Sequence, residues 1–230
     1  MKILVIADHE ENNLWDYWSE QTAEKFADVG LILSAGDLDA AYLEFLVTML
    51  NVPLVYVHGN HEESYLRNPP EGCIDADGKM VDIKFDNASG TVRIFGLGGS
   101  MRYKDQAPFM YSEEEMRRRI KDLRKASLKD RIKDRLRGKR NPDILLTHAP
   151  CRGYGDLTDL PHQGFDCFNE LLHMQHPRLH VYGHVHREYG NSGPIRENSS
   201  GFRRIMDHPS GTTLVNADGW YVLDYFIERN

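Results

Sequence analysis

The chain has 230 residues with a net charge of −7; 40% of the residues are hydrophobic and 27% are charged. This composition excludes a disordered chain, and the length favours one domain with its own core. Three cysteines without a CxxC pair argue against a disulfide framework and a cysteine-bound zinc. No stretch approaches the roughly 18 apolar residues of a membrane span, and the first apolar run is too short for a signal peptide. We therefore expect a soluble cytoplasmic protein.

The first 57 residues alternate between short apolar runs and helical periodicity. They predict strands at Ile3–Ala7, Leu31–Ser34 and Pro53–Val57, separated by helices over Leu14–Ala27 and Ala40–Asn51. Such alternation is typical of βαβ units, in which the strands form a parallel sheet. The first part of the chain is thus expected to be α/β.

The pattern changes after the third predicted strand. A hairpin is predicted from Met80–Phe85 and Thr91–Phe95, which an Asn-Ala-Ser-Gly turn connects. Later strands are expected at Ile144–Thr147 and His180–Gly183, around a helix near Phe165–Gln175. An antiparallel set is expected to close the chain, formed by Phe202–Asp207, Thr212–Asn216 and Tyr221–Ile227. We expect residues 1–230 to form a single domain.

One basic segment interrupts this otherwise acidic chain. Residues 112–140 contain thirteen Lys and Arg against six Asp and Glu. Ser112, followed three residues later by Glu115, is a capping box, so a long charged helix or helix pair is predicted over Ser112–Arg137. The negative net charge disfavours general nucleic-acid binding, but this segment can attract anions locally.

Polar clusters follow five of the predicted strands. In chain order they are Asp8-His9-Glu10, Gly36-Asp37, Gly59-Asn60-His61-Glu62, Thr147-His148-Ala149-Pro150 and Gly183-His184-Val185-His186. A single Asp or His after a strand is usually a cap or a surface residue, but five such clusters are hard to explain in that way. Because the carboxyl ends of strands in an α/β sheet converge on one crevice, we expect the clusters to meet. Nitrogen and oxygen donors without a thiolate suit Mn, Fe, Zn or Ni.

These clusters resemble the motifs of the calcineurin-like metallophosphoesterases. The family pattern is D-x-H, GD, GNH-[DE], a single His and GHxH at successive strand ends, and the resemblance spans nearly the whole chain. It implies a two-sheet β-sandwich flanked by α-helices. From the charge pattern of the basic segment, we further expect residues 101–141 to form an inserted, charged helical lid. The first motif departs from the pattern, since Glu10 stands where the family has His.

The resemblance also implies a dinuclear metal centre. Because Glu10 adds a carboxylate to the donor set, we expect Mn or Fe, with Zn or Ni as further options. One ion would take Asp8, Glu10, Asp37 and His186, and the other would take Asn60, His148, His184 and the shared Asp37. Two such ions, about 3.5–4 Å apart, can share a hydroxide that attacks phosphorus. His61 would either stabilise the phosphoryl oxygens or protonate the leaving group.

Two details of this assignment stay open in the sequence. At the first motif we favour Glu10 over His9 as the ligand, because side chains two residues apart tend to share a direction beyond a strand end. In many relatives, an Asp three residues after the bridging Asp orients the catalytic histidine. Here that position is Ala40, which leaves Asp39 or Glu62 for the task.

Three functions fit the pattern to different degrees. The favoured one is a phosphoesterase that hydrolyses a small phosphomonoester or phosphodiester. A nuclease would hold a phosphate backbone on the basic helix, but acids are interleaved along that helix and aromatic stacking platforms are missing from it. A non-catalytic metal-binding scaffold would be expected to lack a ligand, and here the set is nearly complete. His162, Arg117 and Arg118 are the residues we expect to contact the substrate.

Overall fold

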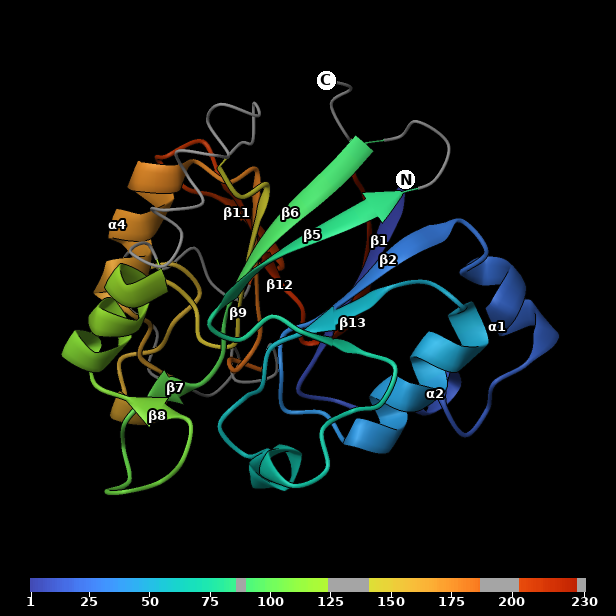
Figure 1. Cartoon of the computed structure of the whole chain (residues 1–230), viewed down its shortest axis with the longest axis horizontal. Coiled ribbons are helices and arrows are strands. Elements are labelled where there is room, and N and C mark those ends of the chain that lie inside the picture. Colours follow the sequence, from blue (N-terminus) through green and yellow to red (C-terminus); the bar gives the residue numbers. More distant parts are fainter. Residues whose placement is uncertain (86–89, 124–140, 187–202, 227–230) are drawn as a thin grey trace.

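The computed structural model describes residues 1–85, 90–123, 141–186 and 203–226, which form two mixed β-sheets with helices on their outer sides (Figure 1). The first sheet has the order β13-β1-β2-β3-β4 and the second has the order β11-β12-β10-β9-β6-β5. The strands of the first sheet are β1 (Lys2–Ala7), β2 (Val29–Ser34), β3 (Leu54–Tyr56), β4 (Ile74–Asp75) and β13 (Gly219–Asp224). Those of the second are β5 (Lys79–Phe85), β6 (Gly90–Leu97), β9 (Ile144–Thr147), β10 (Leu179–Tyr182), β11 (Ile205–Asp207) and β12 (Thr213–Asn216). A short parallel pair, β7 (Ser100–Met101) and β8 (Met110–Tyr111), completes the strands.

The two sheets pack through a shared apolar core. Ile3 and Leu33 from the first sheet and Ile94 and Val181 from the second belong to one cluster and are at most barely accessible to water. A second cluster covers the outer face of the first sheet, where α2 (Ala40–Leu50) packs. A third lies between the second sheet and α4 (Asp166–Gln175). The predicted sandwich flanked by helices is therefore confirmed.

The parallel start of the chain is also confirmed, since β1 pairs with β2 and β2 with β3 in parallel. The prediction of one helix over Leu14–Ala27 is wrong for the first part of that range, which is not helical before Glu20 apart from a 3-10 turn that ends at Leu14. Residues Asn12–Leu14 form a 3-10 turn, and α1 covers only Glu20–Lys25. Ser19 accepts a hydrogen bond from the backbone N–H of Thr22 (3.2 Å). Such an N-cap starts a helix at the following residue, which explains the shorter helix.

The last strands do not form the predicted antiparallel set. β11 is antiparallel to β12, but β12 lies parallel to β10, and β13 pairs antiparallel with β1 in the other sheet. Val215 and Ala217 stay in the core between the sheets while the chain passes from one sheet to the other. This crossing depends on contacts distant in sequence, so local alternation of apolar residues does not predict it.

The capping box of the basic segment is confirmed. The N–H of Ser112 donates to Glu115 (2.7 Å), and the N–H of Glu115 donates to the Ser112 hydroxyl (3.2 Å). The helix is described over residues 113–123 and lies beside α4 (Figure 1). Its residues Met116 and Ile120 pack into the hydrophobic cluster between the second sheet and α4. These turns do not show the predicted lid, and residues 124–140 lie outside the described part of the chain.

The described helices include none that is long and apolar enough to cross a membrane.

Candidate metal centre

The carboxyl ends of β1, β2, β3 and β10 open into a pocket of about 430 Å³. Its lining comprises Asp8, Glu10, Asp37, Leu38, Asp39, Asn60, His61, Glu62, Ser64, Tyr103, Pro161, His162, His184 and His186. Every metal ligand implied by the sequence is in this set except His148, which is fully buried and contacts Asn60 and Asp37. The structure thus brings together side chains that lie up to about 180 residues apart in the chain.

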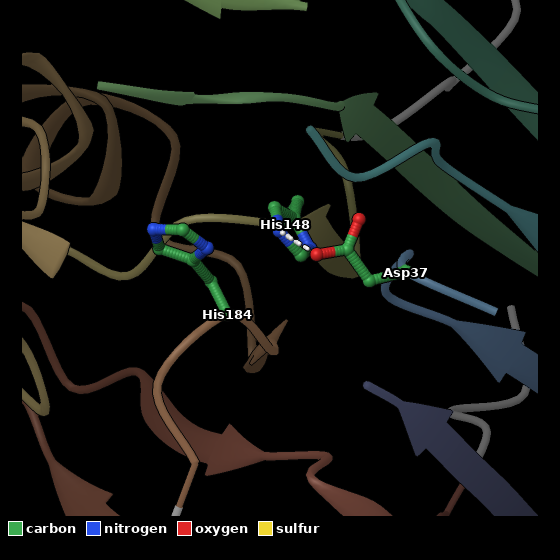
Figure 2. A group of neighbouring side chains, drawn as sticks. All are labelled: Asp37, His148 and His184. Atoms are coloured by element: carbon green, nitrogen blue, oxygen red, sulfur yellow. Dashed lines mark ion pairs between the residues drawn. The ribbon is translucent and has the colours of Figure 1, made fainter. Parts of the chain in front are cut away.

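Among the residues that the structure describes, Asp37, His148 and His184 form a group that could hold a metal ion (Figure 2). Each offers one ligand atom, and these atoms all lie within 4.8 Å of one another. Nε2 of His148 is 3.4 Å from a carboxylate oxygen of Asp37 and 3.0 Å from the side-chain oxygen of Asn60. A group of this size and chemistry can surround one metal ion.

Backbone carbonyls orient both imidazoles. Nδ1 of His148 donates to the carbonyl oxygen of Ala35 (2.8 Å), so Nε2 of the neutral ring carries a lone pair. His184 is turned the other way, because its Nε2 donates to the carbonyl of Pro161 (2.7 Å) and leaves Nδ1 as the ligand atom. Such outer bonds are typical of metal-binding histidines. The lone pairs that meet here repel one another unless a cation or a proton lies between them, so the donor set fits a metal ion.

The titration of these groups reflects the same arrangement. Burial is the largest influence on the pKa of His148 and lowers it, but Asp37, Asp8 and the Ala35 carbonyl together outweigh burial and raise that pKa to about 9. Burial is also the largest influence on the pKa of Asp37 and raises it, but His148, His184 and the backbone N–H of His61 together hold that pKa well below its ordinary range. Burial lowers the pKa of His184 to about 3, which keeps this ring neutral. In the absence of an ion, a proton on His148 therefore compensates the charge of Asp37.

Asp8, Glu10 and His186 line the neighbouring part of the pocket. Both carboxylate oxygens of Asp8 accept from the backbone N–H of His184 (2.9 Å each). Burial raises the pKa of Asp8 to about 7. The exposed Glu10 accepts from the backbone N–H of Asp39 (2.7 Å). This part of the pocket is more open than the group around His148.

His9 is not among the described residues that line the pocket. Its Nδ1 lies 2.7 Å from a carboxylate oxygen of Asp218. Its ring packs edge-on against His186 with the ring centroids 4.6 Å apart. Of the two residues considered at the first motif, Glu10 is the one on the pocket wall.

The strand ends have an unusual backbone. Asp8, Asp37 and His184 have φ values of 65°, 56° and 68°, which L-residues rarely adopt. Two glycines allow the chain to approach them closely. A Cβ on Gly59 would lie 1.9 Å from a carboxylate oxygen of Asp37, and one on Gly183 would lie 2.8 Å from a carboxylate oxygen of Asp8. Any larger residue at Gly59 would displace Asp37.

The predicted catalytic histidine, His61, lies on the exposed side of the pocket, and its backbone N–H donates to Asp37 (3.1 Å). Neither carboxylate considered for orienting its ring does so within the described ranges. Asp39 accepts from the N–H of Ala41 at the start of α2 (2.8 Å). Glu62 is buried and accepts from the N–H groups of Leu38 (2.9 Å) and Gly59. Glu62 thereby connects the two ligand-bearing loops.

Tyr103 is a wall residue that the sequence analysis missed. Its hydroxyl accepts from the side-chain amide of Asn60 (3.3 Å), so the amide oxygen is left facing His148. Tyr103 lies between β7 and β8, and no motif surrounds it. Nothing in the local pattern distinguishes it from the other aromatic residues of that segment.

The three predicted substrate contacts lie in different places. His162 lines the pocket, with its ring centroid 5.5 Å from that of His184. Arg117 makes ion pairs with Glu113 (3.4 Å) and with Glu170 of α4, while Arg118 pairs with Glu114. Neither arginine is among the described residues that line the pocket.

The family model of calcineurin-like phosphoesterases matches residues 1–188. The chain is similar in fold to the crystal structure of TT1561 from Thermus thermophilus, with a TM-score of 0.56 and 15% identity, over 95% of this chain and 89% of that one. At this identity, the similarity bears on the fold alone.

Curated relatives match over a short stretch. Metallophosphoesterase domain-containing protein 1 of Homo sapiens is 43% identical over 51 residues, which is 21% of this chain and 16% of that protein. The UPF0046 protein T07D4.2 of Caenorhabditis elegans is 39% identical over 51 residues, or 21% of this chain and 13% of that protein. The matches thus span less than a fifth of the length of these relatives.

Proposed function

The chain belongs to the calcineurin-like phosphoesterase family, and on this basis we propose that it is a dinuclear metal-dependent hydrolase of small phosphomonoesters or phosphodiesters. The observation that carries the proposal is the group of Asp37, His148 and His184, whose ligand atoms lie within 4.8 Å of one another. Asp37 and His184 line the pocket, and His148 is buried against Asp37. Families of this kind use metal ions for phosphoester hydrolysis, and this donor set fits such an ion.

We assign the ligands in two groups around a shared Asp37. Asn60, His148 and His184 would hold one ion, and Asp8, Glu10 and His186 would hold the other. Glu10 takes the place of the usual histidine, which its position on the pocket wall supports. The added carboxylate favours harder ions such as Mn²⁺ or iron over Zn²⁺.

The bound ions would supply Lewis acidity and an acidified water. The protein's own groups position these parts. Asp37, Asp8 and Glu10 offset the cationic charge, and the carbonyls of Ala35 and Pro161 fix the two imidazoles. His61 lies at the open side of the pocket, where an N–H donor can stabilise the phosphoryl oxygens.

Hydrolysis of p-nitrophenyl phosphate and bis-p-nitrophenyl phosphate tests the proposal. The purified chain should release p-nitrophenol from at least one ester when Mn²⁺ is added, and EDTA should abolish the release. The ratio of the two rates distinguishes a monoesterase from a diesterase. Metal binding without turnover with Mn²⁺, Fe²⁺, Zn²⁺ or Ni²⁺ would overturn the proposal and favour a non-catalytic scaffold.

Replacement of His61 tests its role separately from metal binding. In His61→Ala, turnover should fall about 10²–10⁴-fold, because an N–H donor to the phosphoryl oxygens is lost. Both metal ions should remain, since the side chain is not needed as a ligand. Metal content measured by plasma mass spectrometry distinguishes this outcome, and His173→Ala, which alters an exposed histidine of α4, is the matched control. Loss of metal in His61→Ala would make this residue a ligand.

A contribution of Arg117 and Arg118 to substrate attraction, and a lid formed by residues 101–141, remain proposals based on charge and position. Acidic partners already compensate both guanidinium groups, so their long-range effect is expected to be small and screened by salt. Replacing both with Ala should raise KM about twofold at low salt and leave kcat unchanged. Competition by single-stranded DNA that disappears in this variant would instead favour the nuclease.

A further inference from the structure

We propose that His162, oriented by Asp159, protonates the leaving group of the ester. This inference rests on the proposed phosphoesterase function and divides its chemistry between two histidines. His162 would act on the leaving oxygen, whereas His61 would stabilise the phosphoryl oxygens.

The imidazole of His162 belongs to a carboxylate–histidine pair on the pocket wall. Nδ1 lies 2.5 Å from a carboxylate oxygen of Asp159, three residues earlier in the chain. The side chain of His162 is 25% exposed, so it is held by its surroundings but still reaches the pocket. A carboxylate at Nδ1 fixes the orientation of the ring, and a proton donor needs such a fixed geometry.

The turn that carries this pair is connected to the metal group. Residues Leu160–His162 form η3, a single 3-10 turn. The carbonyl of Pro161, in the middle of that turn, accepts from Nε2 of His184 (2.7 Å). The ring centroids of His162 and His184 are 5.5 Å apart. One hydrogen bond therefore connects the orientation of His184 with the position of the turn that carries His162.

His61 lacks a comparable partner among the residues that the structure describes. Ala40 stands where relatives have an orienting Asp. Asp39 and Glu62, the two nearby carboxylates, are engaged by backbone N–H groups instead. A proton donor works best when its geometry is fixed before reaction, and this condition favours His162 over His61.

In the proposed step, the water oxygen forms a bond to phosphorus. The bond from phosphorus to the leaving oxygen breaks, and its electron pair stays on the leaving oxygen. The leaving oxygen takes the proton from Nε2 of the His162 imidazolium, while the Nδ1 proton stays hydrogen-bonded to Asp159. Water releases its surplus proton to solvent, and the neutral ring regains one from solvent. One water is consumed for each ester cleaved.

Leaving-group dependence tests the proposal. The esters are phenyl phosphate and p-nitrophenyl phosphate, or the matching diesters if the chain is a diesterase. Phenol has a pKa of about 10, like the side chain of tyrosine, so its oxygen needs a proton to depart. Nitrophenolate departs without one. In His162→Gln, kcat/KM should fall about 10²–10⁴-fold for the phenyl ester and less than about tenfold for the nitrophenyl ester.

Asp159→Asn provides a second variant that keeps the size of the orienting residue. In this variant, kcat/KM should again fall more for the phenyl ester than for the nitrophenyl ester. The fall for the phenyl ester should be smaller than in His162→Gln, about tenfold, because the ring keeps a neighbour of the same size but loses its charged partner. His173→Gln, which removes an exposed histidine of α4, should change neither rate. Bound metal and Tm are measured for every variant. If His162→Gln loses metal, the comparison of kcat/KM for the two esters in Asp159→Asn tests the proposal instead.

Equal losses on the two esters, or no loss, would overturn the proposal and leave the phosphoesterase function intact. Selective loss in His61→Gln instead of His162→Gln would assign the proton transfer to His61. If the unmodified chain hydrolyses neither ester with any of the metals, the phosphoesterase function fails, and this inference fails with it.

Discussion

The two halves of the candidate metal centre differ in how firmly the fold holds them. In one half, Asp37 meets two histidines whose ligand atoms are selected by backbone carbonyls, and His148 is fully buried. In the other half, Glu10 is exposed and His186 is half-buried. The first half is arranged for an ion before the ion arrives, whereas the second has an open side.

This difference bears on metal affinity. A preformed set of ligands loses little conformational freedom on binding, and its outer hydrogen bonds add to affinity. An exposed glutamate must be ordered by the ion itself, which costs side-chain entropy. We therefore expect one tight and one weaker metal site. Substitutions in each half and the pH dependence of metal binding test this asymmetry.

His148→Ala should have the largest effect. It removes a buried ligand of the tight half and leaves the Asp37 carboxylate without the imidazole that lies 3.4 Å from it. Activity should fall about 10³-fold or more, as several kcal/mol of metal-based stabilisation are lost. Bound metal should fall from two equivalents to one or fewer. The control is His180→Ala, which alters an equally buried histidine that bonds to Thr147 outside the pocket and should retain both ions. Two retained ions in His148→Ala would refute the assignment.

Glu10→Ala and His9→Ala form a matched pair for the weaker half. Glu10 lines the pocket, while His9 bonds to Asp218. Glu10→Ala should reduce bound metal from two equivalents toward one and lower activity about 10²-fold. His9→Ala should keep both ions. Calorimetric titration with Mn²⁺ measures the number of bound ions in both variants. Loss of an ion in His9→Ala but not in Glu10→Ala would make His9 the ligand.

The tight half should bind metal in a pH-dependent way. The metal-free pKa of His148 is about 9, so its ring carries a proton at neutral pH that an ion must displace. Protonated ligand is unavailable to metal, and the association constant should therefore rise about tenfold per pH unit up to about pH 9 and then level off. Calorimetry with Mn²⁺ in buffers of different ionisation enthalpy counts the released proton. A constant affinity between about pH 7 and 9 would contradict the mechanism.

Tyr103→Phe should have the smallest effect. It removes the acceptor that holds the amide of Asn60 with its oxygen toward His148. A single neutral hydrogen bond contributes about 0.5–1.5 kcal/mol, so metal affinity of the tight half should fall about two- to tenfold. The control is Tyr17→Phe, at a tyrosine that is 68% exposed. An unchanged affinity would show that Asn60 is oriented by His148 alone.

The residues that meet at the strand ends could be predicted from local sequence. Apolar runs predicted the strands, and the polar residues that follow them predicted most of the side chains that line the pocket, because parallel strands place their carboxyl ends at one edge. The glycines at positions 59 and 183 follow from the same logic, since a side chain there would displace Asp37 or Asp8. These features depend on a few neighbouring residues, which is why a local pattern reveals them.

The groups that orient the candidate ligands, and the side-chain partners of the histidines, depend on contacts between segments that are distant in sequence. The carbonyls of Ala35 and Pro161 fix two imidazoles although no side-chain motif marks them, and Tyr103 reaches Asn60 across 43 residues. The local pattern likewise does not predict that β12 and β13 belong to different sheets. Such contacts arise from packing between distant segments, and every residue has a backbone carbonyl, so their partners depend on where the folded chain places them.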